Sequence, residues 1–432
     1  MTGTNPSYAA CLNEFYALQK FGIKFGLSST SALLDRLENP EQGQHFVHIA
    51  GTNGKGSVAS FLAQILRSAG LNVGLYTSPH LVRFTERFQI NGREIPQDQA
   101  ADLMHTVMEV FDPREPPTFF EAVTVMALLY FARRNTDIVI METGMGGRLD
   151  ATNVIHPLVS VITSISMEHQ EYLGSSLLQV AREKAGIIKP SVPVLTAASQ
   201  PKVLECIQET CRAQDAPFYR LGRDFRARMR DSRLFYHGLH AELKAVPLGL
   251  SGRHQARNAA LALAASEILE DKGFLVSDVS RRTGVSQTVW PGRMHLMDGR
   301  PRIMLDGAHN PAAIAALAAS LRENPNYRRL ILVIGIMADK AAKPILRSIL
   351  PLAGQVIFTR PVYPRAMDPF QLRDQAERLP SRNTVIPSLP KALDTARAAA
   401  GDQDLILVTG SLFTVGEALS YLDPAAWAPD PA

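Results

Sequence analysis

The sequence predicts an α/β protein of two domains, each with a mostly parallel sheet. Short β-branched runs recur, and each is followed by a glycine-containing turn and an Ala/Leu-rich helical stretch, as in parallel α/β units. A length of 432 residues is enough for two or three compact units. Regular structure is interrupted at residues 290–293, Trp-Pro-Gly-Arg, before a new α/β pattern begins. We therefore predict a larger domain at residues 1–293 and a smaller, Rossmann-like domain at residues 294–432.

The clearest predicted strands lie in both halves of the chain. In the first half they are Phe46–Ala50, Asp137–Met141 and Leu158–Ile165. In the second half they are Ile303–Leu305, Leu330–Ile334, Val356–Phe358 and Leu405–Val408. An Ala-rich helix is predicted from Asn258 to about Leu269, and the tail Pro424–Ala432, rich in Pro and Ala, is expected to fray.

Residues 217–250 have a different pattern. Positions 225–230, Phe-Arg-Ala-Arg-Met-Arg, alternate apolar and basic side chains, which predicts an antiparallel strand with one apolar and one basic face. The arginine face is compatible with a polyanion partner, but a solvated strand face is the favoured interpretation. The net charge of +4 is too small to indicate nucleic acid or an anionic membrane.

Composition also limits the class of protein. Hydrophobic residues make up 46% and charged residues 20%, as in ordinary globular proteins. Cys11, Cys206 and Cys211 show no CxxC spacing, so neither a disulfide framework nor a zinc ribbon is indicated. No stretch approaches the roughly 18 apolar residues that a membrane span needs, and no signal peptide is recognisable. We expect a cytoplasmic enzyme, a monomer, with neither nucleic acid nor membrane as a partner.

A glycine-rich turn, Gly51-Thr52-Asn53-Gly54-Lys55-Gly56-Ser57, joins the first predicted strand to a helical stretch at residues 58–68. A strand, a glycine turn and a helix N-terminus gather backbone N–H groups around one point, which suits a triphosphate. Lys55 is expected to reach the β- and γ-phosphates and Ser57 to face magnesium. The turn departs from GxxxxGK[ST], because position 49 is Ile and Gly56 separates the lysine from the serine.

Two further polar residues follow predicted strands. Glu142 comes directly after Asp137–Met141, and His169 lies just past Leu158–Ile165, so both are expected at the edge where open α/β sheets bind ligands. The glycines at 144–147 do not complete GxGxxG, because position 149 is Leu, which argues against a nicotinamide cofactor. The sequence also has no signature of a protein nucleophile.

The turn at residues 51–57 resembles the phosphate loop of the folylpolyglutamate synthase and dihydrofolate synthase family, a branch of the Mur ligases. Further matches follow in the family's order at 77–81 (TSPHL), 83–87 (RFTER), 142–153 (ETGMGGRLDATN), 183–187 (EKAGI), 291–293 (PGR), 305–311 (LDGAHNP) and 409–411 (TGS). The resemblance covers nearly the whole chain. It implies a P-loop ATPase domain and a glutamate ligase domain. The implied reaction joins L-glutamate to dihydropteroate or to the γ-carboxylate of folates through an acyl phosphate, with release of ADP and phosphate.

The resemblance also implies a metal set. It assigns magnesium to Ser78, Glu142 and His169, in addition to Ser57 from the phosphate loop, and implies two magnesium sites in all. An imidazole ligand is uncommon for magnesium, which prefers oxygen, so His169 depends on the resemblance. Lys184 matches a lysine that is carbamylated in the family and helps to organise the second site; the alternative is a solvated helix lysine.

Substrate positions follow in the same way. The residues that match the pterin site of bacterial bifunctional enzymes are Thr118, Phe119, Phe120, Glu121, Leu149, Asp150 and Ala151. An aromatic face and a carboxylate suit a flat ring with donor edges, although Phe119 and Phe120 have core packing as an alternative. Arg83 belongs to a segment, Arg83–Arg87, that is expected to form a mobile loop whose arginines pair with folate carboxylates.

Nucleotide-binding positions are implied between the domains. Asn258, Arg293 and Asp306 match positions that contact ATP, and His309 is expected near the phosphate and the incoming amine. A capping Asp306 and a turn His309 are the structural alternatives. Ser411 is assigned to the substrate.

Lys55, Lys184 and His309 are the expected catalytic residues. Another Mur-type ligase is an alternative, but it would not be expected to carry Ser78-Pro79-His80. A nucleotide-driven switch would lack an acceptor-binding second domain. Whether the enzyme uses dihydropteroate, folates or both is open, and the Phe120 and Asp150 neighbourhood favours both.

Overall fold

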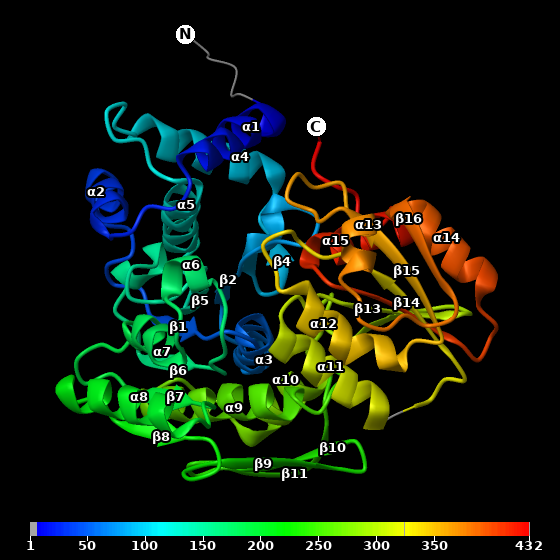
Figure 1. Ribbon diagram of the computed structural model, residues 1–432. Coiled ribbons are helices and arrows are strands. Elements are labelled where there is room, and N and C mark those ends of the chain that lie inside the picture. Colours follow the sequence, from blue (N-terminus) through cyan, green and yellow to red (C-terminus); the bar gives the residue numbers. More distant parts are fainter. Residues whose placement is uncertain (1–6, 324, 432) are drawn as a thin grey trace.

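The computed structural model describes residues 7–323 and 325–431, and the strands of this part form three sheets (Figure 1). The largest has the order β4-β3-β2-β5-β1-β6-β7-β8. At its centre β1 (Phe46–Ala50) pairs in parallel with β5 (Ile138–Glu142) and β6 (Val159–Ile162). The other strands are β2 (Val73–Tyr76), β3 (Phe88–Ile90), β4 (Arg93–Glu94), β7 (Val194–Thr196) and β8 (Phe218–Arg220).

Helices cover both faces of this sheet. They are α1 (Tyr8–Ala17), α2 (Ser28–Arg36), α3 (Lys55–Ser68), α4 (Gln97–Glu109), α5 (Phe119–Arg133), α6 (Gln170–Leu173), α7 (Leu177–Ala185), α8 (Pro201–Ala213), α9 (Gln255–Asp271) and α10 (Asp278–Gln287), with 3-10 turns η1 (Leu18–Phe21), η2 (Phe84–Arg87) and η3 (Ala151–Val154). Val47 and Ile49 of β1 pack with α3 and α9, whereas Phe46 packs with α1, α4 and α5. Because both faces are buried, β1 shows no alternation of buried and exposed residues, and its one polar side chain, His48, lies 2.8 Å from Thr152 Oγ1.

A small antiparallel sheet covers the outer side of α9. Its strands are β9 (Arg226–Arg230), β10 (Arg233–His237) and β11 (Glu242–Pro247), with β10 in the middle. The arginines of β9 are exposed, while Ala227 and Met229 pack against the core. The predicted apolar and basic faces of this strand are confirmed.

The second domain has a six-stranded sheet of order β12-β13-β17-β14-β15-β16, parallel except for β12. Its elements are β12 (His295–Met297), β13 (Arg302–Asp306), α11 (Pro311–Glu323), β14 (Leu330–Ile334), α12 (Ala342–Ile349), η4 (Leu350–Leu352), β15 (Gln355–Arg360), α13 (Pro369–Asp374), β16 (Asn383–Ser388), α14 (Leu389–Ala399), β17 (Leu405–Thr409) and α15 (Leu412–Leu422). The predicted α/β class is confirmed, whereas the boundary at residue 293 stays a prediction.

The two domains meet closely beside the phosphate loop. Helix α15 approaches the segment after β2 so tightly that a Cβ on Gly416 would lie 2.0 Å from the carbonyl oxygen of Leu81. In Figure 1 the second domain, yellow to red, therefore stands beside α3 and β4. Within the described ranges, no helix has the length and apolar composition to cross a bilayer.

The expectation of a frayed tail is wrong for residues 424–431, while residue 432 lies outside the described residues. Asp430 accepts hydrogen bonds from the Tyr8 hydroxyl at 2.9 Å and from the Phe84 N–H at 2.7 Å. Trp427 packs on the second-domain core. These contacts tie the tail to α1 and to the loop at η2, and composition alone does not reveal such long-range partners.

Candidate active site

The phosphate loop connects β1 to α3 and depends on its glycines. Gly51 has φ 146°, and a Cβ there would lie 1.8 Å from Oγ1 of Thr163. Gly54, with φ 93°, is the N-cap of α3, which begins at Lys55. The helix N-terminus therefore opens directly onto the turn, the geometry that binds phosphate.

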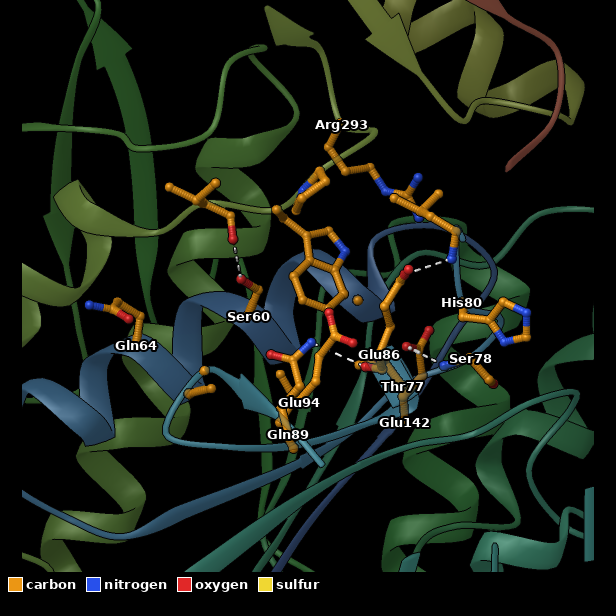
Figure 2. A pocket seen from close by; sticks show the side chains of 18 of the residues that line it. Ser60, Gln64, Thr77, Ser78, His80, Glu86, Gln89, Glu94, Glu142 and Arg293 are labelled. Carbon is orange, nitrogen blue, oxygen red and sulfur yellow. Dashed lines mark hydrogen bonds between the residues drawn. The ribbon is translucent and has the colours of Figure 1, made fainter. Parts of the chain in front are cut away.

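Glu142 is the last residue of β5 and is only 5% exposed. One carboxylate oxygen accepts a hydrogen bond from the N–H of Ser78 at 3.4 Å (Figure 2). The other lies 3.9 Å from Lys55 Nζ. Burial raises the pKa of Glu142, against the opposing charges of Lys55 and Arg293. A buried carboxylate with such weak partners is suited to a cation.

The other expected metal ligands lie around the same edge. Ser57 is buried in the first turn of α3, and His169, in a left-handed conformation with φ 44°, is the N-cap of α6. Burial lowers the pKa of His169, which favours the neutral imidazole that binds metals. No group of three His, Cys, Asp or Glu side chains among the described residues is placed to hold a metal. The predicted set, with two serines, is of a different kind and stays a prediction.

Lys184 lies on α7 with its side chain 1% exposed. Its Nζ donates to the carbonyl oxygen of Gly51 at 2.8 Å and to Glu168 Oε1 at 2.7 Å. Burial lowers its pKa to about 8, against the opposing effect of Glu168. The alternative of a solvated helix lysine is therefore wrong, because the side chain supports the phosphate loop from inside the fold.

The second domain contributes the turn after β13. Asp306 accepts hydrogen bonds from the N–H groups of Met294 at 2.8 Å and Ala308 at 2.9 Å. His309 Nδ1 lies 2.8 Å from the carbonyl oxygen of Gly307, and burial lowers its pKa to about 4. Both side chains thus hold the turn, as in the structural alternative, and their contacts with ATP and amine stay predictions.

Three more predicted residues are placed by the structure. Asn258 of α9 faces the phosphate loop, since a Cβ on Gly54 would lie 2.5 Å from its Oδ1. Arg293 lines a cavity of about 480 Å³ together with Glu142 (Figure 2). Ser411, by contrast, is 2% exposed and caps α15 through the N–H of Thr414 at 2.9 Å.

A second cavity, of about 300 Å³, gathers every residue predicted for the pterin site: Thr118, Phe119, Phe120, Glu121, Leu149, Asp150 and Ala151. Its remaining walls include Arg87, which belongs to the predicted folate loop Arg83–Arg87, and also the segment 22–26, Leu173 and Glu183, to which the sequence analysis gave no role. Segment 22–26 lies between the first two helices in a stretch without periodicity, so no local signal indicates it.

Two carboxylates that line this cavity, Glu121 and Asp150, accept hydrogen bonds from nearby backbone N–H groups. Glu121 accepts a hydrogen bond from the Thr118 N–H at 2.7 Å and donates its own N–H to Thr118 Oγ1 at 3.3 Å, which makes a capping box for α5. Asp150 accepts from the N–H groups of Met145 at 2.8 Å and Thr152 at 3.0 Å. The predicted hydrogen bonds from a pterin ring to these two carboxylates would compete with the backbone bonds that the carboxylates already accept.

Both rings pack against the core and also line the cavity. Phe119 stacks on Tyr16 at 5.5 Å. Phe120 lies 6.3 Å from Tyr76 and against Gly144, where a Cβ would be 2.4 Å from its ring. Core packing and a place in the cavity are therefore combined in each ring.

The loop at η2 differs from the expectation. Arg83 is paired with Glu94 at 2.6 Å and donates to the carbonyl oxygen of Ala426 at 3.1 Å, so its guanidinium already has partners. Arg87 is instead the arginine of the pterin cavity: it is 6% exposed, donates to His80 Nδ1 at 2.9 Å and stands 5.5 Å from the Phe119 ring centroid. Among the described residues it has no ion-pair partner.

Lys340 is a further residue that the sequence analysis missed. It follows β14 in the second domain, and its charge contributes to lowering the pKa of both His169 and His309. Its side chain is 19% exposed and 2.8 Å from Asp339. The positive field across the cleft thus comes from both domains.

A phosphate loop with a weakly paired, buried carboxylate beside it and a second α/β domain against it are the features of a two-domain nucleotide-binding protein. Mur ligase models match residues 49–266 (middle domain) and 292–412 (glutamate ligase domain). The Bacillus subtilis dihydrofolate synthase/folylpolyglutamate synthase is 34% identical over 410 residues, 92% of this chain and 95% of its own length. The chain belongs to the dihydrofolate synthase/folylpolyglutamate synthase family of Mur ligases.

Solved structures agree over the whole chain. The Escherichia coli FolC enzyme in complex with DHPP and ADP has a TM-score of 0.89 and 31% identity, covering 98% of this chain and 100% of that one. The Yersinia pestis bifunctional enzyme complexed with AMPPNP and Mn ion has a TM-score of 0.87 and 28% identity, covering 98% and 100%. The reaction is that of the family, the ATP-dependent ligation of glutamate to dihydropteroate or folates. This excludes the nucleotide-switch alternative.

Proposed function

We propose that this enzyme has both activities, the addition of L-glutamate to dihydropteroate and to the γ-carboxylate of folates, through an acyl phosphate. One observation carries the proposal: Ser78 and Pro79 line both cavities. The cavity with Phe120 therefore adjoins the cavity with Glu142 and Arg293. A pteridine held in the first would direct its carboxylate toward the phosphates in the second.

The pterin cavity is suited to a ring with polar edges. Phe120 offers an aromatic face, and Arg87 offers a buried guanidinium without an ion-pair partner among the described residues. Such a charge is costly unless a ligand oxygen completes its hydrogen bonds. We assign Arg87 to an acceptor oxygen of the pteridine substrate.

The reaction proceeds in two steps. A carboxylate oxygen of the acceptor attacks the γ-phosphorus of ATP, and ADP leaves. The α-amine of glutamate then attacks the carbonyl carbon of the acyl phosphate, gives up a proton, and phosphate leaves. Lys55 and Arg293 neutralise negative charge on the phosphates and hold the reacting groups in position. His309, with Nδ1 directed at the Gly307 carbonyl, keeps Nε2 as an acceptor for an amine N–H.

Ser57, Ser78, Glu142 and His169 are the residues that would hold Mg²⁺. Bound there, Mg²⁺ neutralises charge on the phosphates. Lys184 has a pKa of about 8, so part of it is a neutral amine near neutral pH, the form that reacts with CO₂ to give a carbamate and a proton. The carbamate would place an anion beside the phosphate loop.

The experiment offers the purified enzyme ATP, magnesium and glutamate with dihydropteroate or tetrahydrofolate in separate reactions, and follows ADP. We expect ADP release to require an acceptor and to occur with both. Release with one acceptor alone contradicts the dual activity, and acceptor-independent release contradicts the ligase route. Phe120→Ala should weaken both reactions, since the ring is common to both substrates and an aromatic contact contributes roughly 0.5–1.5 kcal/mol.

A further inference from the structure

A pair of asparagine side chains joins the phosphate loop to the second domain. Asn310 Nδ2 donates to Asn53 Oδ1 at 2.8 Å, and Asn53 Nδ2 donates back to Asn310 Oδ1 at 3.2 Å. The two residues are 257 positions apart, and Asn310 is 6% exposed. Since each domain supplies one amide, the pair exists only while the domains lie against each other.

Both residues are held by other bonds. The backbone carbonyl oxygen of Asn53 accepts hydrogen bonds from Thr163 Oγ1 at 2.8 Å and Ser164 Oγ at 3.0 Å. Asn310 Oδ1 also accepts the N–H of Ala313 at 2.9 Å and so caps α11. Each side chain therefore projects from a rigid support, which makes the pair a defined spacer between the domains.

The pair lies next to the reacting groups in the chain. Asn53 is two residues before Lys55, and Asn310 follows His309 directly. We propose that Asn310 is a positioning residue: its amide holds the His309 turn against the phosphate loop, so that the amine rather than water consumes the acyl phosphate. This inference rests on the acyl-phosphate route proposed above, because an intermediate sensitive to water makes domain closure matter.

Asn310→Asp separates this role from helix capping. An aspartate keeps an oxygen for the N–H of Ala313 and favours a helix N-terminus. It cannot donate to Asn53 Oδ1, and it sets a carboxylate against that carbonyl oxygen. The fold should be retained, while the pair loses its stronger bond, from position 310 to Asn53 Oδ1, and keeps at most the bond that Asn53 Nδ2 donates.

The experiment measures ADP released per glutamate incorporated, kcat, KM for ATP and the thermal midpoint. Asn310→Asp is compared with Asn310→Ala, which loses both cap and link. The matched control is Ser388→Asp, which puts the same charge at the N-cap of α14, an exposed position four strands from β13 in the sheet.

We expect Asn310→Asp to lower kcat for ligation by about tenfold or more, with KM for ATP changed less than about threefold, and to release at least about twice as much ADP per glutamate. Its thermal midpoint and the Ser388→Asp kinetics should match the wild type. Wild-type coupling and kcat in Asn310→Asp, with a defect confined to Asn310→Ala, would reduce Asn310 to a helix cap and overturn the inference. Failure of the proposed function is distinct, because the wild type itself would then release ADP without an acceptor.

Discussion

Two buried carboxylates end strands of the two larger sheets, and their surroundings differ. Glu142 ends β5 and Asp306 ends β13, and each is 5% exposed. Asp306 accepts two backbone N–H groups at 2.8 and 2.9 Å. Glu142 accepts one at 3.4 Å and has Lys55 at 3.9 Å.

The difference separates two kinds of sheet edge. In the second domain, backbone N–H groups satisfy the carboxylate of Asp306, and we call this the satisfied edge. The edge of the first domain at Glu142, beside the phosphate loop, is called the open edge. The first domain leaves its carboxylate weakly paired in a cavity, as expected where a cation and phosphates complete the site. Equal position and equal burial therefore do not imply equal roles; hydrogen-bond satisfaction distinguishes them.

The largest expected effect is at Lys55 on the open edge. Lys55→Ala should lower kcat by at least about 100-fold, because it removes positive charge that stabilises the transferring phosphate. The thermal midpoint should stay close to that of the wild type, since the Lys55 side chain is expected to contact the nucleotide and not the hydrophobic core. Normal turnover with either pteridine would contradict the assignment of the phosphate loop.

Variants of Lys184 test whether catalysis at the phosphate loop also requires the negative charge of a carbamate. Lys184→Arg keeps a cation but cannot form a carbamate, so it should lose activity by at least about 50-fold, as Lys184→Ala should. In the wild type, exhaustive removal of CO₂ should lower activity and bicarbonate should restore it. An active arginine variant, or no response to bicarbonate, rules the carbamate out.

A variant of Asp306 tests whether this carboxylate stabilises the fold of the second domain rather than binding a ligand. Asp306→Ala leaves two buried N–H groups without acceptors, which should cost about 2 kcal/mol in the free energy of unfolding. Denaturant unfolding measures this directly. Unchanged stability combined with a large rise in KM for ATP would mean that Asp306 acts as a ligand and that the two edges are alike.

Glu142 should behave in the opposite way. Its pKa is raised by burial, so its ionised form destabilises the metal-free fold at neutral pH, and this penalty vanishes as the pH falls below the unfolded value of about 4.3. Glu142→Gln should therefore unfold no more easily than the wild type at pH 7 without magnesium. The magnesium concentration for half-maximal rate should rise by about tenfold; an unchanged titration removes Glu142 from the metal set.

The sequence predicts strand β1 and the phosphate loop because their signals are adjacent in the chain. Strand β1 coincides with the predicted Phe46–Ala50, and the glycine turn follows it directly, so strand, turn and helix are all local signals. The predicted helix at Asn258 begins three residues earlier, at Gln255. Strand β2 (Val73–Tyr76) was not predicted, because four residues interrupted by Gly74 carry too little pattern.

Long-range partners account for the rest. The link between Asn53 and Asn310 joins positions 257 apart, and the bond from Tyr8 to Asp430 joins positions 422 apart. Neither leaves a periodic pattern that a window of sequence could reveal. Arg83 and Glu94 are only 11 positions apart, yet their pairing also leaves no periodic pattern: a motif indicates that a guanidinium is present, but only the fold decides which acceptor it meets.

In the proposed reaction, ATP bound at the phosphate loop transfers its γ-phosphoryl group to a carboxylate of the substrate held in the pterin cavity. Dihydropteroate labelled with ¹⁸O in its carboxylate tests this directly, because the acyl phosphate must break its carbon–oxygen bond when glutamate attacks. Mass spectrometry of the released phosphate should show one ¹⁸O atom per turnover. Unlabelled phosphate, with glutamate ligated at the normal rate, would contradict the account.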